Sequence, residues 1–268
     1  MDSSDSRLRS MDNALKYQFN DAVSAYDEMR PTYVKALFDD VIRYAHLNSE
    51  KQALEVGIGT GQATLPFLQT GCRVTAIEIG EALARFCEEK FAEYQKFSVL
   101  NIDFESADID DNAYDLFYCA SAFHWIPKEI GYKKAFRVLK RGGVLALFFN
   151  RPFPANENAP VHIALQKVYD KYMPSSSKPH RFNEDECAEI INPIRHYGFI
   201  DAHYKLYHNT RSFDADQYVK LTGTYSDHRS MPDDKRIRME LDFREAINGC
   251  GGVYTLHDTI DLYLAKKP

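Results

Sequence analysis

Three glycines spaced two residues apart follow a short apolar run, and this is the segment with the clearest chemical meaning. Gly57, Gly59 and Gly61 come directly after Ala53-Leu54-Glu55-Val56. Glycine lets the backbone approach a ligand closely, and open α/β sheets bind ligands at the carboxyl ends of their strands. The nicotinamide dinucleotide fingerprint would instead need its third glycine at position 62, where the chain has Gln62. The loop therefore favours a different cofactor, although a glycine turn can also be purely structural.

Two acidic residues lie at the ends of the next two apolar runs. Glu78 ends one run, and Asp103 with Phe104 follows the other. A carboxylate at the end of the second strand can accept both hydroxyls of a ribose. Asp103 is suited to accept a hydrogen bond from an adenine amino group, and Phe104 to pack on the ring. Each acid alone is more often a capping or surface residue, but together they predict a site for an adenosine-containing cofactor.

The elements that position these residues alternate between strands and helices in the first part of the chain. Short apolar runs bounded by turn residues are typical of strands covered on both faces. Helical periodicity separates several of them, and Gly142-Gly143 is expected to end the helix that contains Tyr132 and Leu139. The pattern predicts a parallel, doubly wound α/β sheet. Its expected strands are residues 52–56, 73–78, 97–102, 114–119 and 144–149.

Helices are expected on both sides of this region. Residues 11–29 and 33–44 predict two helices separated by Arg30-Pro31, and residues 160–172 predict another. A capped helix should begin at Asn183, and Pro193 should break it before Gly198. Residues 199–208 and 254–264 are expected strands, with a helix inside 230–248. We expect one domain, with an N-terminal helical flap at about 1–46, a cofactor-binding core at about 50–150 and a helical lid near 213–249 in the remainder to 268.

The motifs and their order resemble those of class I S-adenosylmethionine-dependent methyltransferases. The resemblance covers about residues 50–150. It implies a Rossmann-like seven-stranded sheet whose last strand is antiparallel, with S-adenosylmethionine as the cofactor along the carboxyl ends of strands one to four. The residues that carry it are Glu55-x-Gly57-x-Gly59-x-Gly61, Glu78, Asp103, Tyr114-Asp115-Leu116-Phe117-Tyr118 and Val138-Leu139-Lys140-Arg141-Gly142-Gly143.

The flanks are similar to a small-molecule branch of that superfamily, which includes the trans-aconitate type methyltransferases. This similarity rests on Tyr26, on Arg30-Pro31-x-Tyr33, and on the segments Thr224-Tyr225-Ser226-Asp227 and Gly251-Gly252-Val253-Tyr254. The acceptor that it implies is a small molecule methylated at a carboxylate, hydroxyl or amine.

The family's cofactor roles carry over to matching residues of this chain. Glu55 would orient the glycine loop and the amino group of the cofactor, and the loop itself would line the methionine part. Glu78 would hold the ribose, and Arg30 is a candidate partner of the cofactor carboxylate. The expected cofactor-binding residues are Glu55, Gly57, Gly59, Gly61, Glu78, Asp103, Phe104, Ala120, Arg30 and Tyr26.

The segment after the fourth strand, Ala120-Ser121-Ala122-Phe123-His124-Trp125, is expected to border the position of methyl transfer. His124 is the candidate general base for a hydroxyl or ammonium acceptor, because imidazole exchanges protons near neutral pH. A carboxylate acceptor needs no base, and a histidine beside Trp125 can also be a wall residue. His124, Trp125 and Tyr225 are the expected acceptor contacts.

Composition and charge indicate where in the cell the protein works and which partners it does not bind. The charge is −6, from 33 basic and 39 acidic residues, and no basic block could neutralise a row of phosphates. We therefore expect no nucleic acid partner. The longest clean apolar run, Val144 to Phe149, is too short to span a bilayer, so we expect no membrane partner either. The odd, scattered cysteines and the polar N-terminus predict a cytoplasmic protein. The histidine spacing predicts no metal site.

Three other functions share parts of this pattern. A nucleotide-dependent oxidoreductase is disfavoured by Gln62. An aminopropyl transferase shares the fold, but its acidic catalytic segment is missing where this chain has Ser121-Ala122-Phe123-His124. A non-catalytic cofactor-binding protein would have the same binding residues, and only turnover distinguishes it from an enzyme.

Overall fold

The computed structural model describes residues 23–174 and 180–268. Contacts within the chain divide it into two compact units. The core unit comprises Pro31–Asn150, Asn183–Tyr207 and Ile260–Pro268. The flank unit comprises Met1–Arg30, of which residues 23–30 are described, Arg151–Phe182 and His208–Thr259. No helix in the described residues is long and apolar enough to cross a membrane.

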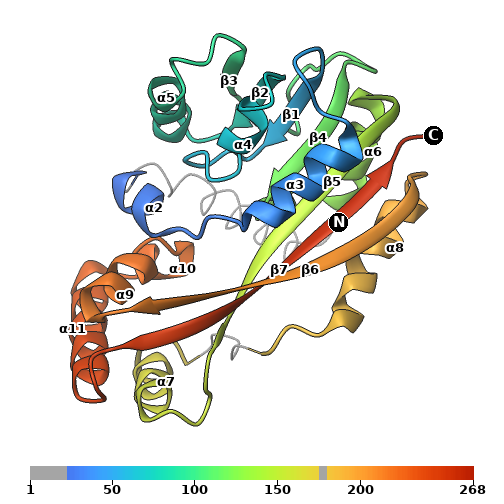
Figure 1. The fold of residues 1–268 in the computed structure, drawn as a ribbon. Coiled ribbons are helices and arrows are strands. Elements are labelled where there is room, and N and C mark those ends of the chain that lie inside the picture. The colour runs from blue at the N-terminus through green and yellow to red at the C-terminus, as the bar shows by residue number, and fades with distance from the viewer. Residues whose placement is uncertain (1–22, 175–179) are drawn as a thin grey trace, which may run out of the picture. The chain divides into compact units, whose positions relative to one another are not determined.

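Seven strands form a mixed sheet in the order β3-β2-β1-β4-β5-β7-β6 (Figure 1). The pairs β1–β2, β1–β4, β2–β3 and β4–β5 are parallel. Register places Glu55 beside Tyr118 and Glu78 beside Asn101, so the chemically important residues collect at one edge of the core unit. The strands are β1 (Gln52–Val56), β2 (Arg73–Glu78), β3 (Phe97–Asn101), β4 (Tyr114–Ala120), β5 (Leu139–Pro154), β6 (Ile200–Phe213) and β7 (Tyr254–Lys266).

The last strand is antiparallel, as the family resemblance implies. The amide of Gly142 donates to the carbonyl of Lys267 (2.8 Å), which pairs the start of β5 with the end of β7. The amide of Ala155 donates to the carbonyl of Thr255 (3.0 Å), which pairs the end of β5 with the start of β7. The predicted α/β, Rossmann-like seven-stranded class is therefore confirmed.

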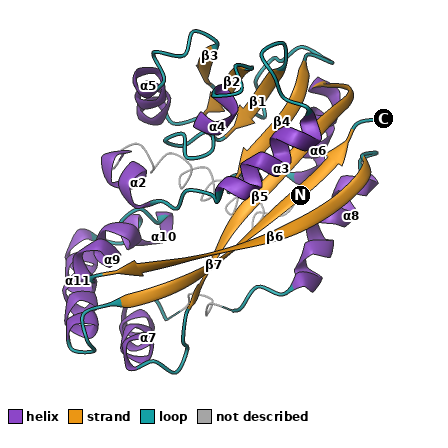
Figure 2. Cartoon of the chain, viewed as in Figure 1, coloured by secondary structure: helices purple, strands orange, loops and turns teal. Residues whose placement is uncertain are grey.

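Helices cover both faces of the sheet in the core unit (Figure 2). The apolar stripe of α3 packs with α4, α5 and the face of β4 that carries Leu116 and Tyr118. Successive side chains of a strand point to opposite faces. Phe117 accordingly contacts Phe104 and Phe123 on the other face, where α6 and α8 contact each other. The helices are α3 (Lys35–Ala45), α4 (Leu65–Leu68), α5 (Glu81–Lys90), α6 (Lys128–Val138) and α8 (Ala188–His196), with short 3-10 turns η2 (Phe123–Trp125) and η3 (Glu184–Cys187).

The flank unit is mainly helical and has its own apolar cluster. Helix α11 packs against α7 and α9, and α2 packs against α9. Phe243 and Tyr218 lie inside this cluster, with ring centroids 5.4 Å apart. The expected helical insertion before the last strand is confirmed, because three helices separate β6 from β7. The helices are α2 (Val23–Met29), α7 (Pro160–Tyr172), α9 (Ala215–Thr222), α10 (Ser226–Arg229) and α11 (Asp233–Asn248).

One prediction about a helix end is wrong. Helix α6 ends at Val138, and Gly142-Gly143 lie within β5. The amides of Asn112 and Ala113 donate to the carbonyls of Arg137 and Val138, so a loop satisfies the end of the helix. Leu139 is then extended and pairs with Tyr114 of β4.

Pro193 also does not break its helix, because α8 continues through it to His196. A proline here removes one intrahelical hydrogen bond. The helix buries Ile191 and Ile194 on either side of the proline, which offsets that loss. The expected helix start at Asn183 is confirmed by a capping box with Glu186. The part of the first predicted helix before Val23 lies outside the described residues.

Candidate functional site

The glycine loop after β1 has a backbone that only glycine adopts readily. Gly57, Gly59 and Gly61 have φ values of +72°, +60° and +82°. The amide of Gly57 donates to the carbonyl of Ile77 (2.9 Å). A Cβ atom on Gly57 would lie 2.6 Å from the Cβ of Ala122, so the loop touches the segment that follows β4. The loop and this segment together therefore form the carboxyl-end edge of β1 and β4.

Glu55 is buried at the end of β1 and is bound by two hydroxyl groups. Its Oε2 accepts hydrogen bonds from Thr64 Oγ1 and Tyr118 OH, each at 2.7 Å. Burial raises the pKa of Glu55 to about 7, and the charge of Glu78 adds to the increase, while the two hydroxyls oppose it. Through Thr64, Glu55 fixes the start of the segment after the glycine loop. Sequence reasoning predicted Glu55 but not its contacts with Thr64 and Tyr118.

Glu78 connects the loops that follow β1 and β2. Its Oε2 accepts from the amide of Gly59 and its Oε1 from the amide of Gly80, each at 2.9 Å. Burial raises its pKa, and these backbone hydrogen bonds oppose the increase. Asn101 Nδ2 donates to the carbonyls of Glu78 (2.9 Å) and Ile79 (3.1 Å). Asn101 was not predicted, yet it fixes the end of β2 against β3.

Asp103 and Phe104 lie in the turn after β3 but point to different surroundings. Asp103 Oδ1 accepts from the amide of Glu105 (3.1 Å), so the side chain caps this turn. Phe104 is buried, with its ring 5.7 Å from that of Phe117 and 5.0 Å from Lys134 Nζ. The ring of Phe104 therefore supports the turn from inside the protein. Asp103 is only half-buried.

The chain bends sharply where β4 ends at Ala120. Ser121 has φ +53°, an uncommon value for a residue other than glycine. Its Oγ is 2.8 Å from Tyr33 OH and accepts from the amide of Asn150 (3.2 Å). Such strained positions are common at functional sites. The Tyr33–Ser121 contact joins two segments that sequence reasoning considered separately.

His124 and Trp125 follow this bend in η2. Their ring centroids are 4.9 Å apart, and the ring of Phe149 is 6.3 Å from that of His124. His124 is exposed and Trp125 is half-buried. The imidazole is therefore accessible from solvent.

Arg30, Tyr26 and Tyr225 form a second cluster, in the flank unit. The guanidinium carbon of Arg30 is 4.7 Å from the ring centroid of Tyr26 and 5.0 Å from that of Tyr225. Its Nη2 donates to the carbonyl of Thr224 (2.8 Å), whereas its buried Nε has no hydrogen-bond partner in the described part of the chain. Burial raises the pKa of Tyr225, and the charge of Arg30 opposes this. The cluster presents a cation between two aromatic rings.

The described residues contain no group of three or more His, Cys, Asp or Glu side chains that could hold a metal ion. The expected absence of a metal stays a prediction.

Comparisons with known proteins agree with the predicted family. A family described as a methyltransferase domain matches residues 54–147. An uncharacterized methyltransferase of Schizosaccharomyces pombe is 23% identical over 234 residues, covering 85% of this chain and 86% of that protein. An uncharacterized methyltransferase of Mycobacterium tuberculosis is 31% identical over 137 residues, covering 51% of this chain and 53% of that protein.

A solved structure with this fold is phosphoethanolamine N-methyltransferase 2 of Haemonchus contortus, in complex with phosphomonomethylethanolamine and S-adenosylhomocysteine. It has a TM-score of 0.55 and 12% identity, and the match covers 92% of this chain and 57% of that chain.

Proposed function

We infer that this chain is a class I S-adenosylmethionine-dependent methyltransferase, which uses S-adenosylmethionine as its cofactor and transfers the methyl group to a small-molecule acceptor. The assignment of the cofactor residues rests on the hydrogen bond between the glycine loop and Glu78. One carboxylate holds the backbone of both loops at the ends of β1 and β2. We assign this edge of the sheet to the cofactor.

The residues at this edge fit an adenosine-containing ligand. The carboxylate of Glu78 accepts backbone hydrogen bonds from Gly59, Gly80 and Ile79, and a carboxylate can accept about four in all. The remaining capacity suits ribose hydroxyls. The cofactor supplies a methyl group on a sulfonium, already activated for in-line displacement. We propose as cofactor-binding residues Glu55, Gly57, Gly59, Gly61, Glu78, Asp103, Ala120, Tyr26 and Arg30, with Phe104 supporting the Asp103 turn from beneath.

The protein's own task is to align the acceptor and keep water out. For a hydroxyl or ammonium acceptor, we assign the removal of its proton to His124, whose imidazole is exposed next to Trp125. A carboxylate acceptor would need only to be positioned. Arg30 is the candidate partner of the cofactor carboxylate, since its Nε has no hydrogen-bond partner among described residues.

Several observations support a small acceptor over a macromolecule. The net charge of −6 disfavours nucleic acid, and the flank unit carries an aromatic cluster around Tyr218, Tyr225 and Phe243. Aromatic side chains with a few polar groups are typical of small-molecule sites. The Haemonchus neighbour carries phosphomonomethylethanolamine, also a small molecule. We propose that the flanks select the acceptor and that the chain belongs to the small-molecule branch that includes the trans-aconitate type methyltransferases. The five cysteines form no disulfide among the described residues, and we propose a cytoplasmic location.

Both S-adenosylmethionine and S-adenosylhomocysteine should stabilise the protein. At about 100 times the dissociation constant, binding linkage adds ~2.7 kcal/mol to the free energy of unfolding. The melting temperature should rise by roughly 5–11 °C at this chain length. Thermal unfolding followed by fluorescence measures this increase. A shift produced by NAD and by neither of these compounds would refute the assignment.

Glu78→Ala should weaken binding of S-adenosylhomocysteine by about 10- to 100-fold. Hydrogen bonds to a charged group are worth roughly 1.5–3 kcal/mol, and each 1.4 kcal/mol is tenfold in affinity. The ligand-free protein should also lose stability, because the amides of Gly59 and Gly80 lose their acceptor. Calorimetry measures the affinity. Glu81→Ala, which removes a nearby exposed carboxylate paired with Arg85, is the matched control. Equal affinities in both variants would mean that Glu78 is only a structural acid.

Acceptor turnover should depend on the flanks and on His124. In Tyr26→Phe, Tyr225→Phe and His124→Ala, we expect transfer to the best acceptor to fall at least tenfold, about 1.4 kcal/mol on the barrier. Cofactor affinity should stay near normal in at least two of the three. A panel of carboxylate, hydroxyl and amine compounds supplies the acceptors, and Tyr204→Phe, at an exposed tyrosine of β6, is the control. Full transfer by all three variants would mean that the acceptor site does not include these residues.

A further inference from the structure

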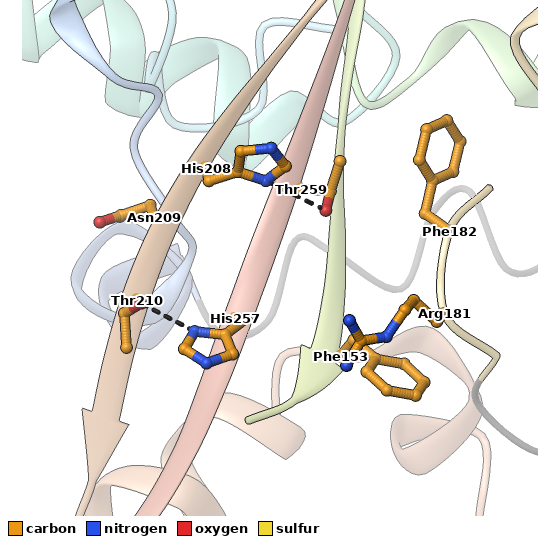
Figure 3. Close-up of a pocket in the computed structure, with 8 residues that line it drawn as sticks. All are labelled: Phe153, Arg181, Phe182, His208, Asn209, Thr210, His257 and Thr259. Carbon is orange, nitrogen blue, oxygen red and sulfur yellow. Dashed lines mark hydrogen bonds between the residues drawn. The ribbon is translucent and has the colours of Figure 1, made fainter. Parts of the chain in front are cut away.

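A cavity of about 520 Å³ lies on one face of the β6–β7 pair in the flank unit (Figure 3). None of its residues belongs to the cofactor motifs or to the proposed acceptor contacts. Its walls come from three strands and from the segment that precedes Asn183. It is lined by Phe153, Arg181, Phe182, His208, Asn209, Thr210, His257 and Thr259.

Two histidine–threonine pairs cross from β6 to β7 on this face. Thr210 Oγ1 is 2.8 Å from His257 Nδ1, and Thr259 Oγ1 is 3.5 Å from His208 Nδ1 (Figure 3). Each imidazole thus uses its Nδ1, and neither Nε2 has a partner in residues 23–174 and 180–268. When threonine donates to Nδ1, the hydrogen of the neutral ring sits on Nε2. Both rings can then donate to a ligand.

Arg181 adds a full positive charge to this face. Its guanidinium carbon is 5.3 Å from the ring centroid of Phe153, and it forms no ion pair or hydrogen bond with any described residue. No acidic residue lines the cavity. The ion pair between Arg211 and the buried Asp258 belongs to the alternate positions of β6 and β7, whose side chains point away from the two histidine–threonine pairs.

We propose that this cavity binds an organic phosphate, with its phosphate group on Arg181 and the two imidazoles and its apolar part against Phe153 and Phe182. A tetrahedral phosphate offers acceptor oxygens in several directions, which suits donors that come from two strands and a loop. A planar carboxylate would engage fewer of them. The chain is acidic overall, at −6, so the attraction is local to this face. The volume lies within the range of small-molecule sites and exceeds that of phosphate alone.

The test is calorimetry with phenyl phosphate, compared with inorganic phosphate, benzoate and benzyl alcohol. We expect saturable binding of phenyl phosphate, weaker binding of inorganic phosphate and benzoate, and none of benzyl alcohol. Arg181→Gln should lower the affinity for phenyl phosphate at least tenfold. Phe153→Leu should lower it for phenyl phosphate and leave inorganic phosphate unchanged. Arg238→Gln, at an exposed arginine of α11 in the same unit, should change neither.

Further measurements distinguish loss of phosphate binding from misfolding of a variant and from an effect on cofactor binding. Thermal unfolding shows whether each variant is folded, and the imidazole NMR resonances of His208 and His257 should move when phenyl phosphate is added to the parent protein. Arg181→Gln should bind S-adenosylhomocysteine normally, which separates this site from the proposed cofactor site. No saturable binding, benzoate binding as tight as phenyl phosphate, unmoved imidazole resonances or equal weakening by Arg238→Gln would each overturn the proposal.

Discussion

Gly57→Ala should lower the affinity for S-adenosylmethionine at least 100-fold, about 2.8 kcal/mol. The new Cβ would lie 2.6 Å from the Cβ of Ala122, closer than real Cβ atoms approach other heavy atoms. Ala122 has no flexible side chain that could move aside, so the glycine loop or the segment after β4 must shift. Both form the edge that we assign to the cofactor. Calorimetry with the purified variant measures the loss.

Gly142→Ala is the matched control for this experiment. Gly142 has φ +73°, nearly that of Gly57, so alanine meets a similar backbone penalty of about 1–2 kcal/mol. A Cβ there would meet nothing within 4 Å. The control should therefore lose some stability and keep its cofactor affinity. If both variants bind equally well, the contact between Gly57 and Ala122 has no part in the site.

Glu55→Gln should change how stability depends on pH. Burial raises the pKa of Glu55 from its ordinary 4.5 to about 7. Below pH 4.5 both the native and the unfolded chain hold this proton, and the native state keeps its full stability. Between pH 4.5 and 7 the unfolded chain releases the proton first, so the free energy of unfolding falls. The total loss from this residue is about 3 kcal/mol.

Urea unfolding of both proteins from pH 5 to pH 8 measures this effect. Glutamine is neutral at every pH and can still accept from Thr64 or Tyr118, so the variant should gain stability relative to the parent protein as pH rises. Glu81→Gln, at an exposed carboxylate, should follow the parent profile. Parallel profiles for the parent protein and Glu55→Gln would contradict the assigned protonation of Glu55.

The strands that carry the cofactor motifs could be predicted because their sequence signals are local. Apolar runs bounded by turn residues gave β1 and β2 with correct ends, and the helix at Pro160–Tyr172 was predicted to the residue. Helix ends were less predictable where distant residues decide them. Amides of Asn112 and Ala113 end α6, and packing of Ile191 and Ile194 keeps α8 intact through Pro193.

The candidate site was predictable in its backbone and its acids, but not in the partners of those acids. Thr64 and Tyr118 reach Glu55 only because β1 and β4 are neighbours and the chain returns after the loop. The Tyr33–Ser121 contact likewise joins residues 88 positions apart. Such pairs depend on tertiary packing, which the periodicity of one sequence does not encode. The burial of Phe104 against Phe117 is a further result of packing that its position in the chain did not reveal.

Transfer of an isotope-labelled methyl group from S-adenosylmethionine in an extract tests the central claim most directly. The purified protein is incubated with the labelled cofactor and an extract from which the endogenous cofactor has been removed, and the products are separated by size. We predict label in the small-molecule fraction, S-adenosylhomocysteine formed in equal amount, and loss of both with Gly57→Ala but not with Gly142→Ala. Label in protein or nucleic acid, with none in the small-molecule fraction, would contradict the account.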